Sequence, residues 1–360
     1  MKSTIHVATK QAYDVIVGQD LLDEVGQDII KICPTASKAF VISDSNVASL
    51  YLDKIIASLR NSNLETAVYV FEAGEESKNS DTYIAILQAM ASNFLTRTDV
   101  VVSLGGGVCS DMAGFAAATF LRGIDVIHVS TSLLGQVDAS IGGKTGIDLP
   151  NGKNLVGAFW QPKLVVIDTN TLETLPREQI IEGMAEVIKY ALIMDAVLYD
   201  LLKNTNLDEI ITNPQLRYEM VRQCVLDKTD VVVSDEFDNG RRQILNFGHT
   251  IGHVLEKMSD FKLSHGRAVA KGMSIVLNAS RKEGLCDAAT NDNGIDLIKA
   301  YELSVEDDTS SELLAQGAMS DKKKRGGTVS LVVVSSIGEA KIVKKSIDEL
   351  EAFLEARKEC

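Results

Sequence analysis

The sequence predicts an α/β N-terminal domain with a Rossmann-like parallel sheet, over residues 1–175, followed by a mainly helical domain over residues 176–360. Three observations predict this organisation. The chain has 360 residues, 45% of them apolar, which is more than a single core usually organises. Short β-branched runs alternate with longer helical patterns from residue 38 to about residue 170. From Pro176 to about Glu283 the apolar residues follow a helical period almost throughout.

Five β-branched runs of the first domain are predicted to be parallel strands, because a helical pattern separates each run from the next. These runs are Lys38–Asp44, Thr66–Phe71, Asp99–Leu104, Asp125–Ser130 and Lys163–Asp168. The boundary is expected near Leu175 and Pro176, where the last strand gives way to the first helix of the second domain. A strand-like run at Thr328–Ser335 and a charged helix at Ser346–Arg357 predict a small return to β structure.

Composition and charge argue against several classes of function. The formal net charge of −14 disfavours nucleic acid as a partner, since binding its phosphates needs a basic face. The sequence has no run of eighteen apolar residues and no basic-then-apolar leader, so we expect neither a membrane partner nor export. The five cysteines are odd in number and scattered, without a Cys-x-x-Cys pair. They indicate a reducing compartment, and we expect the cytoplasm.

A glycine-rich turn follows the third predicted strand. The segment Gly105-Gly106-Gly107-Val108-Cys109-Ser110-Asp111 leads into a helix of small residues. Without Cβ atoms, the backbone N–H groups of such a turn can approach a pyrophosphate, and the positive end of the helix dipole favours the anion. The spacing is not the usual Gly-x-Gly-x-x-Gly, so a plain tight turn remains the alternative to a dinucleotide site.

Two segments rich in Lys, Gly and Asn, Val137–Gly146 and Asn151–Gly157, are expected to form loops. Lysine offers a mobile point charge to phosphate or carboxylate, and glycines let the backbone fold closely around a ligand. Lys144 or Lys153 taken singly could be an ordinary surface lysine. Two such segments in close succession, near Arg122, favour a site for an anionic substrate.

The predicted helix Gly183–Met194 is apolar on nearly every side, which is typical of a buried helix. Its only charges are Glu186 and Lys189, which lie three residues apart and therefore on one face. Burying them unpaired is costly. Either they form a buried ion pair, or Glu186 binds a metal and Lys189 a substrate oxygen, since buried ionisable groups concentrate in functional sites.

Three of the five histidines fall within a short stretch of the second domain. His249 and His253 are four residues apart, so on a helix their rings share a face, and His265 could return to that face after a loop. With Glu186 they form a ligand set that suits zinc and related ions and leaves a position open for substrate. The helix lacks the Glu of His-Glu-x-x-His, and core histidines bonded to the backbone are the alternative.

These motifs together resemble the 3-dehydroquinate synthase family, one of the sugar-phosphate cyclases. The segments that carry the resemblance are Gly105–Asp111, Thr131–Lys144, Gly152–Gly157, Gly183–Lys189, Leu245–His253 and Ser264–Gly266. Their order along most of the chain makes the combination far more specific than any single motif. The resemblance implies an NAD-binding α/β domain followed by a helical metal domain. It also implies conversion of 3-deoxy-D-arabino-heptulosonate 7-phosphate to 3-dehydroquinate and phosphate, in the shikimate route to aromatic amino acids.

The resemblance further implies roles for individual residues. The metal, zinc or cobalt, would be bound by Glu186, His249 and His265. NAD would be bound at the matching positions Asp44, Gly74, Glu75, Glu76, Ser77, Lys78, Gly106, Gly107, Val108, Asp111, Thr131, Ser132, Lys144, Lys153, Thr171, Leu172, Glu173 and Thr174. Substrate binding and catalysis would be carried out by Asp138, Lys144, Lys153, Asn154, Lys189, Lys228, Arg242, Asn246, His253 and one lysine of Asp321-Lys322-Lys323, such as Lys322. Arg122 would reach the partner subunit's site, which implies a homodimer.

The implied chemistry is consistent with these residue types. NAD takes a hydride from the carbon that bears the metal-bound hydroxyl, phosphate is then eliminated, and NADH returns the hydride before an intramolecular aldol step closes the ring. The protein has only to position the substrate and neutralise its charges, which explains a site rich in Lys, Arg and His without a nucleophile triad.

Two departures and two rival interpretations remain. Cys109 and Ser110 stand where the family more often has an aliphatic residue and a glycine, and Ser132 stands where threonine is common. A metal-dependent polyol dehydrogenase shares the domain plan, but a neutral polyol gives Lys144 and Lys153 no anionic group to bind. A catalytically silent binding module would not need to retain all three candidate metal ligands.

Overall fold

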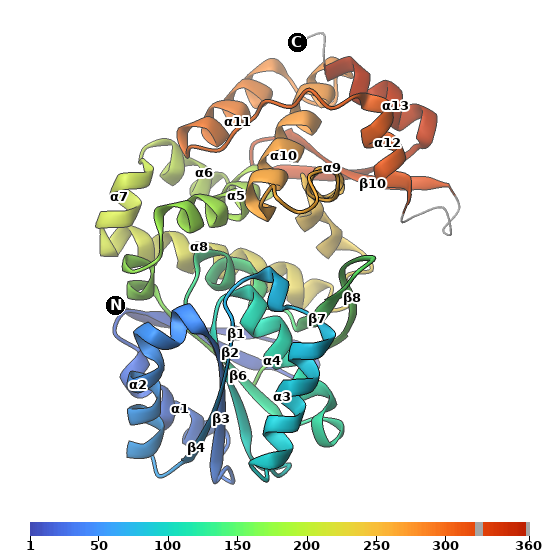
Figure 1. Ribbon diagram of the computed structural model, residues 1–360. Helices are drawn as coiled ribbons and strands as arrows, with labels where there is room; N and C mark the ends of the chain where they lie inside the picture. The colour runs from blue at the N-terminus through green and yellow to red at the C-terminus, as the bar shows by residue number, and fades with distance from the viewer. Residues whose placement is uncertain (321–326, 358–360) are drawn as a thin grey trace. The chain divides into compact units, whose positions relative to one another are not determined.

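The computed structural model describes residues 1–320 and 327–357, and the chain forms two compact units (Figure 1). Unit 1 comprises residues 1–175 and 214–237, and unit 2 comprises residues 176–213 and 238–360. The predicted fold class is confirmed, because unit 1 contains a largely parallel sheet and unit 2 is mainly helical. Residues 214–237 fall in unit 1, whereas the sequence analysis expected an unbroken second domain from residue 176 onward.

A seven-stranded sheet with the order β1-β2-β9-β6-β5-β3-β4 forms the centre of unit 1. All neighbouring strands pair in parallel except β1 and β2. The strands are β1 (Lys2–Val7), β2 (Tyr13–Gly18), β3 (Lys38–Asp44), β4 (Glu65–Phe71), β5 (Val100–Gly105), β6 (Asp125–Ser130) and β9 (Leu164–Asp168). The five predicted strands are β3, β4, β5, β6 and β9, with ends that agree within one residue. The hairpin of β1 and β2 was not predicted.

Helices cover both faces of this sheet, with α1 and α2 on one side and α3 and α4 on the other (Figure 1). These helices are α1 (Val25–Ile32), α2 (Ser45–Asn61), α3 (Ser80–Ser92) and α4 (Gly107–Thr119). In β3, Ala39 and Val41 join the core that includes α1 and α2, while Phe40 and Ile42 join the core that includes α3 and α4. Burial on both faces explains why the strand reads as a continuous apolar run.

The chain changes direction across the sheet at β3. It leaves β3 for β4 on one side and returns to β5 on the other side. In open parallel sheets, ligands bind outside the carboxyl ends of the strands at such a switch point. Asp44 ends β3 and Gly105 ends β5, so the topology alone marks this edge as a ligand site.

A separate antiparallel hairpin, β7 (Lys144–Leu149) and β8 (Gly152–Phe159), occupies the segment that the sequence analysis expected to be loops. The strands approach closely at Gly157, where a Cβ atom would lie 2.0 Å from the carbonyl oxygen of Thr145. The glycines read as loop formers therefore serve a close backbone pairing.

The remaining elements of unit 1 are short helices and one long helix. They are η1 (Leu22–Glu24), η2 (Glu75–Ser77), η3 (Phe120–Arg122), η4 (Gly135–Ala139), η5 (Thr169–Glu173) and α8 (Pro214–Ser234). Ion pairs connect α8 to the rest of the unit: Arg217 pairs with Glu173, and Lys228 pairs with Asp138.

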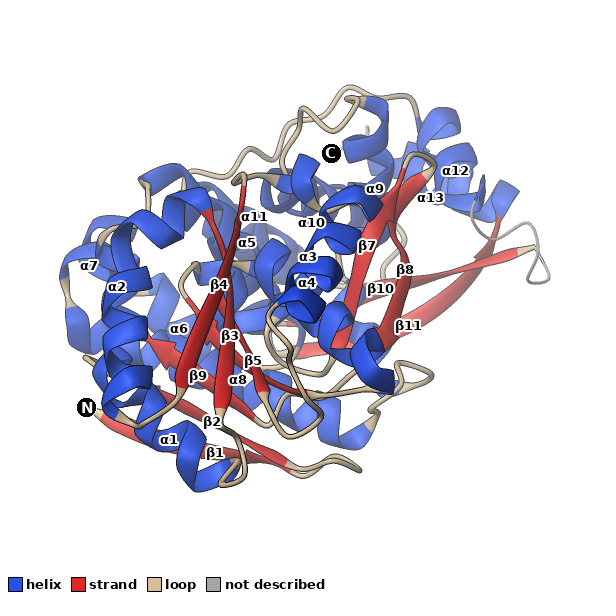
Figure 2. Cartoon of the chain, turned by 60° about the horizontal axis from the view of Figure 1, so that its bottom comes forward, coloured by secondary structure: helices blue, strands red, loops and turns tan. Residues whose placement is uncertain are grey.

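Unit 2 consists of helices and one long hairpin, whose two strands are drawn in red in Figure 2. The elements are α5 (Arg177–Ile193), α6 (Ala196–Lys203), α7 (Leu207–Thr212), η6 (Arg241–Asn246), α9 (His249–Met258), α10 (His265–Lys282), α11 (Ala288–Ala300), α12 (Ser311–Ser320), β10 (Thr328–Ser336), β11 (Glu339–Ser346) and α13 (Ile347–Ala356). Strand β10 and helix α13 match the two late elements predicted from the sequence. Within the described ranges, no helix is both long enough and apolar enough to span a bilayer.

Helix α10 packs tightly against both α5 and α9. A Cβ atom on Gly266 would lie 2.1 Å from the carbonyl oxygen of Glu182 in α5, and one on Gly272 would lie 2.1 Å from that of Gly248. Only glycine permits these approaches, so the backbones of three helices are brought together at these points.

We predict that His128 makes the stability of the protein depend on pH. Its side chain is 3% exposed in β6, Nδ1 has no hydrogen-bond partner among the described residues, and burial lowers its pKa to about 4. The unfolded chain therefore binds a proton that the native state excludes, so stability falls as the pH drops from 6.5 toward 4, by up to about 1.4 kcal/mol per pH unit.

Urea unfolding at pH 7, 6 and 5 tests this prediction. His128→Leu should flatten the pH dependence of the free energy of unfolding relative to the wild type. His6→Leu, at an exposed position, should keep the pH dependence of the wild type. An identical slope for His128→Leu and the wild type would contradict the prediction.

Candidate active site

Three side chains of unit 2 converge on one point: Glu186 in α5, His249 at the start of α9 and His265 at the start of α10. One ligand atom from each lies within 4.8 Å of the others. Nε2 of His249 is 3.3 Å and Nε2 of His265 is 3.5 Å from Oε1 of Glu186. The structure thus brings together the three residues that the sequence analysis assigned to a metal.

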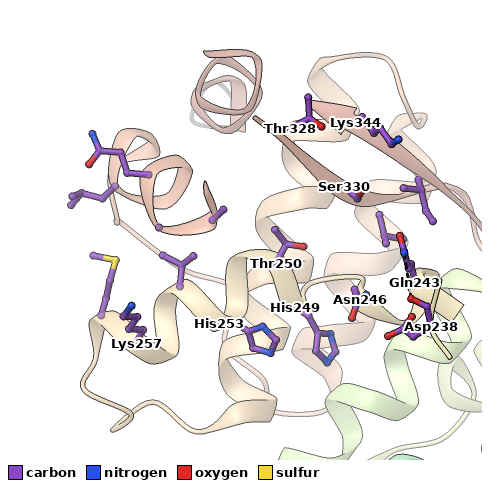
Figure 3. A pocket seen from close by; sticks show the side chains of 18 residues that line it. Asp238, Gln243, Asn246, His249, Thr250, His253, Lys257, Thr328, Ser330 and Lys344 are labelled. Carbon is purple, nitrogen blue, oxygen red and sulfur yellow. Dashed lines mark hydrogen bonds between the residues drawn. The ribbon is translucent and has the colours of Figure 1, made fainter. Parts of the chain in front are cut away.

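The backbone explains how these residues meet. Gly248, with a φ of 77°, adopts the left-handed conformation just before α9, and a Cβ there would lie 2.6 Å from the carbonyl oxygen of Val269. His249 and His253 lie on one side of α9 (Figure 3), with ring centroids 5.5 Å apart. The His265 ring is 5.3 Å from that of His249. The helical spacing read from the sequence therefore produces a cluster of three imidazoles.

Both ligand imidazoles turn the same nitrogen toward Glu186. Nδ1 of His249 lies 3.1 Å from the carbonyl oxygen of Phe247, and Nδ1 of His265 lies 3.4 Å from Oε2 of Glu256. Because a carbonyl oxygen can only accept, Nδ1 of His249 must be the donor of that hydrogen bond, and Nε2 is the nitrogen that faces Glu186.

Electrostatics at the cluster favour a cation. Burial alone would raise the pKa of Glu186, but Lys189 and His249 outweigh it and hold that pKa well below its ordinary value. Burial alone would lower the pKa of His265, but the neighbouring carboxylates of Glu186 and Glu256 raise it to about 10. A carboxylate that stays ionised and imidazoles surrounded by negative charge are suited to a positive ion.

The donor set also fits a divalent metal by its chemistry. Glu186 is 1% exposed, and among the described residues neither of its oxygens accepts a hydrogen bond of good geometry, although Lys189, His249 and His265 lie within ion-pair distance. Two imidazole nitrogens and one carboxylate are typical of zinc and cobalt sites that keep a position open. The ion pair of Glu186 and Lys189, the alternative interpretation from sequence, is present as well.

A pocket of about 820 Å³ lies within unit 2 beside the cluster (Figure 3). His249, His253 and Asn246 line it, together with residues of α12, β10 and β11. Arg242 and Lys189, also predicted to contact substrate, are buried in the same unit. Lys322 lies outside the described residues.

The residues predicted to bind NAD gather at one edge of the sheet in unit 1, except Lys144 and Lys153, which lie in the β7–β8 hairpin. Each group follows the carboxyl end of a parallel strand: Asp44 after β3, residues 74–78 after β4, residues 106–111 after β5, residues 131–132 after β6 and residues 171–174 after β9. The carboxyl ends of parallel strands meet at one edge, so these segments lie along it.

The glycine turn after β5 packs closely against the segment that follows β6. Gly106 precedes the first residue of α4, and a Cβ on it would lie 2.8 Å from Oγ of Ser132, whose hydroxyl accepts from N–H of Gly135. Cys109, the departure from the family pattern, is buried beneath the turn and donates to the carbonyl of Ile42. Burial raises the pKa of its thiol to about 12, so the thiol is inert packing.

Lys78 connects the carboxyl edge of the sheet to the β7–β8 hairpin. Its Nζ donates to Oδ2 of Asp111 and to Oδ1 of Asn154, both at 2.6 Å. Burial alone would lower the pKa of Lys78, but the carboxylates of Asp111 and Glu75 keep it above its ordinary value. Oδ1 of Asp148 accepts from N–H of Asn154, which stabilises the left-handed φ of 56° at Asn154.

Other predicted substrate residues fall in unit 1. Lys228 of α8 and Asp138 of η4 form an ion pair of 2.7 Å, and both were singled out from the sequence. Lys144 is exposed at the start of β7, and Nζ of Lys153 is 3.9 Å from Oε1 of Glu75. Arg122 is exposed at the end of η3, with a positive φ of 68°.

The sequence analysis missed three carboxylates around these sites. Glu182 and Glu256 lie in the surroundings of His265, and Asp148 lies beside Asn154. Helical spacing could have identified the first two, because Glu182 is four residues before Glu186 and Glu256 is three residues after His253. No sequence signal marks Asp148, since its role depends on the unpredicted hairpin.

Comparison with known proteins identifies the family. Residues 68–182 match the family described as 3-dehydroquinate synthase N-terminal, and residues 183–324 match 3-dehydroquinate synthase C-terminal. The 3-dehydroquinate synthase of Clostridium beijerinckii is 40% identical over 343 residues, which cover 94% of this chain and 97% of that protein. The 3-dehydroquinate synthase of Streptococcus pneumoniae is 41% identical and covers 95% of this chain and 96% of its own.

Solved structures share the fold. The 2-epi-5-epi-valiolone synthase of Streptomyces hygroscopicus, with NAD+ and Zn2+ bound, has a TM-score of 0.86 and 26% identity and covers 99% of both chains. A 2-deoxy-scyllo-inosose synthase complexed with carbaglucose-6-phosphate, NAD+ and Co2+ has a TM-score of 0.85 and 22% identity, covering 98% of this chain and 99% of its own. From the two matched family regions and the near full-length relatives, the chain belongs to the 3-dehydroquinate synthase family.

Proposed function

We propose that the chain is a carbon–oxygen lyase that converts 3-deoxy-D-arabino-heptulosonate 7-phosphate to 3-dehydroquinate and phosphate. The observation that carries the proposal is the convergence of Glu186, His249 and His265 on one point, in a chain about 40% identical to 3-dehydroquinate synthases. A family member that had lost the activity would not need to keep this donor set.

The proposal includes one zinc or cobalt ion and NAD. The ion would be bound by Glu186, His249 and His265, and NAD would lie along the carboxyl edge of the sheet in unit 1. The NAD+ and Zn2+ or Co2+ in the related cyclases support this assignment. When bound, the ion polarises the substrate hydroxyl, and NAD supplies a reversible hydride acceptor.

The chain's own cations would hold the anionic groups of the substrate. Lys189 and Arg242 are nearly inaccessible, so a carboxylate or phosphate that reaches them meets positive charge in a site that contains little water. In unit 1, Lys228 is kept oriented by its ion pair with Asp138. Lys144 and Lys153 would add mobile positive charge, while Asn246 and His253, both at the unit 2 pocket, offer hydrogen bonds.

Two broader features belong to the proposal. We place the protein in the cytoplasm, which is supported by Cys33, Cys109, Cys224 and Cys286, all buried and free of disulfides among the described residues. We also propose a homodimer, in which the exposed Arg122 contributes to the partner subunit's site.

Phosphate release from the sugar phosphate tests the proposed reaction directly. With NAD and metal present, the protein should release phosphate and form dehydroquinate without net NADH, because the hydride is returned. Removing the metal with a chelator should abolish release, and adding Zn2+ or Co2+ should restore it. No release despite bound NAD and metal would reject this substrate, and net NADH formed from a polyol would identify a dehydrogenase instead.

His249→Ala should lose metal and turnover together, because it removes one of two imidazole ligands. We expect metal affinity to fall by more than about 100-fold, since even the outer partners of ligands contribute 10-fold to 100-fold. Metal content after dialysis and phosphate release measure the two effects. His6→Ala, at an exposed position in unit 1, is the control and should keep both properties. Full activity of His249→Ala without metal would remove the metal role.

Lys144→Ala should weaken substrate binding without unfolding the protein, because Lys144 is exposed and contributes little packing. We expect kcat/KM to fall roughly 10-fold to 100-fold, equivalent to about 1.4 to 2.7 kcal/mol. Steady-state kinetics and a thermal melt provide the measurement, with Lys163→Ala, another exposed lysine of unit 1, as the control. Unchanged KM and kcat would place Lys144 outside the site.

A further inference from the structure

The imidazole of His265 lies between two carboxylates. Nε2 is 3.5 Å from Oε1 of Glu186, and Nδ1 is 3.4 Å from Oε2 of Glu256. Glu256 is 1% exposed although its neighbour Lys257 on α9 is exposed. A carboxylate is rarely buried to this extent without a structural or functional reason, because losing its hydration is costly.

The two ring nitrogens of a ligand histidine have different tasks. A neutral imidazole coordinates a metal through one nitrogen while the other carries a proton, and the acceptor at that proton fixes the tautomer and the ring orientation. His249 has such an acceptor in the carbonyl oxygen of Phe247. Among the described residues, the acceptor that faces Nδ1 of His265 is the side chain of Glu256.

The backbone of His265 is held independently of its ring. Oε2 of Glu182 accepts from N–H of Gly266 at 2.9 Å, and Oε1 accepts from the hydroxyl of Ser264. The missing Cβ of Gly266 allows this close contact with α5. Because the backbone on both sides of His265 is fixed, loss of the Glu256 contact should change ring orientation rather than unfold α10.

We propose that Glu256 is a positioning residue that accepts the Nδ1 proton of His265 and thereby directs Nε2 to the metal. The negative charge of Glu256 also makes the ring a stronger ligand than a neutral acceptor would. This inference rests on the proposed function, since it presupposes a metal at Glu186, His249 and His265. It assigns Glu256 a task that the metal ligands alone do not define.

Metal affinity is the measurement that tests this proposal. Full-length wild type, Glu256→Gln and Glu256→Ala are stripped with a chelator, and their Co2+ affinities are determined by competition with a chromophoric chelator. Gln keeps an acceptor oxygen without the charge, so we expect Co2+ to bind about 10-fold more weakly, and Ala, which keeps neither, up to about 100-fold more weakly. Glu178→Gln is the matched control. Glu178 is a mostly exposed carboxylate, and it pairs with Arg267, which is close in sequence to His265. Its Co2+ affinity should stay within about twofold of the wild type.

Nuclear magnetic resonance of the zinc-loaded protein provides a readout that a merely structural role would not change. With only five histidines in the chain, ¹⁵N-labelled imidazoles can be assigned by substitution. We expect the wild type to show a protonated, slowly exchanging Nδ1 on His265, and Glu256→Ala to lose that signal while its melting temperature still reports a folded protein. If the Ala variant does not fold, the Co2+ affinity of Glu256→Gln decides the question, because Gln keeps the acceptor oxygen and loses only the charge.

The outcomes separate this inference from the proposed function. In one outcome the wild type binds Co2+ and turns over, and Glu256→Gln binds Co2+ as tightly and keeps the same His265 tautomer. This outcome overturns the positioning role and leaves the proposed function standing. Wild type that neither binds Co2+ nor releases phosphate rejects both. A second ion in the wild type that is lost in Glu256→Gln would show that His253, Glu256 and His265 form their own metal site, which also overturns the proposal.

Discussion

The burial of one carboxylate constrains much of unit 2. Glu186 lies in the middle of α5, where almost every neighbour is apolar, and an ionised group at such a place is tolerated only when positive charge surrounds it. Lys189 from the same helix and the imidazoles of His249 and His265 from two other helices provide that surrounding. The need to surround Glu186 with positive charge therefore determines both the stability of α5 in this position and the chemistry of the site.

Bringing imidazoles from separate helices to one carboxylate requires the helices to approach closely. Gly266 and Gly272 in α10 allow contacts with α5 and α9 that any side chain would prevent. Gly248 turns the chain so that α9 begins with a ligand. In unit 1 the requirement is met differently, because the parallel sheet itself collects the chain segments at its carboxyl edge. There glycine also serves close backbone pairing, as Gly157 does against Thr145.

The extent to which the sequence predicted the structure depends on the range of the interactions. The five predicted strands agree within one residue. In β3, β5, β6 and β9 burial on both faces produces continuous apolar runs, whereas β4 lies at the edge of the sheet and was recognisable from its β-branched and aromatic residues. The cluster of Glu186 and the imidazoles was predictable because His249 and His253 follow a helical period and Glu186 is an acid in an apolar helix. The β7–β8 hairpin was not predictable, since Gly157 favours a turn locally and its pairing with Thr145 is visible only in three dimensions. Glu256 follows the helical spacing of His253, but its contact with His265, which belongs to a different helix, could not be read from that spacing.

The position of α8 has a consequence for how the chain can be divided. The backbone passes between the units after Leu175, after Asn213 and after Phe237, so neither unit is one continuous piece of sequence. A fragment that ends at Leu175 would lack the helix that packs against β1 and β2 and that supplies Lys228 to Asp138. The half that contains the sheet is therefore not an independent module: recombination at the apparent boundary would transfer an incomplete sheet domain, and the two halves are expected to be inherited together.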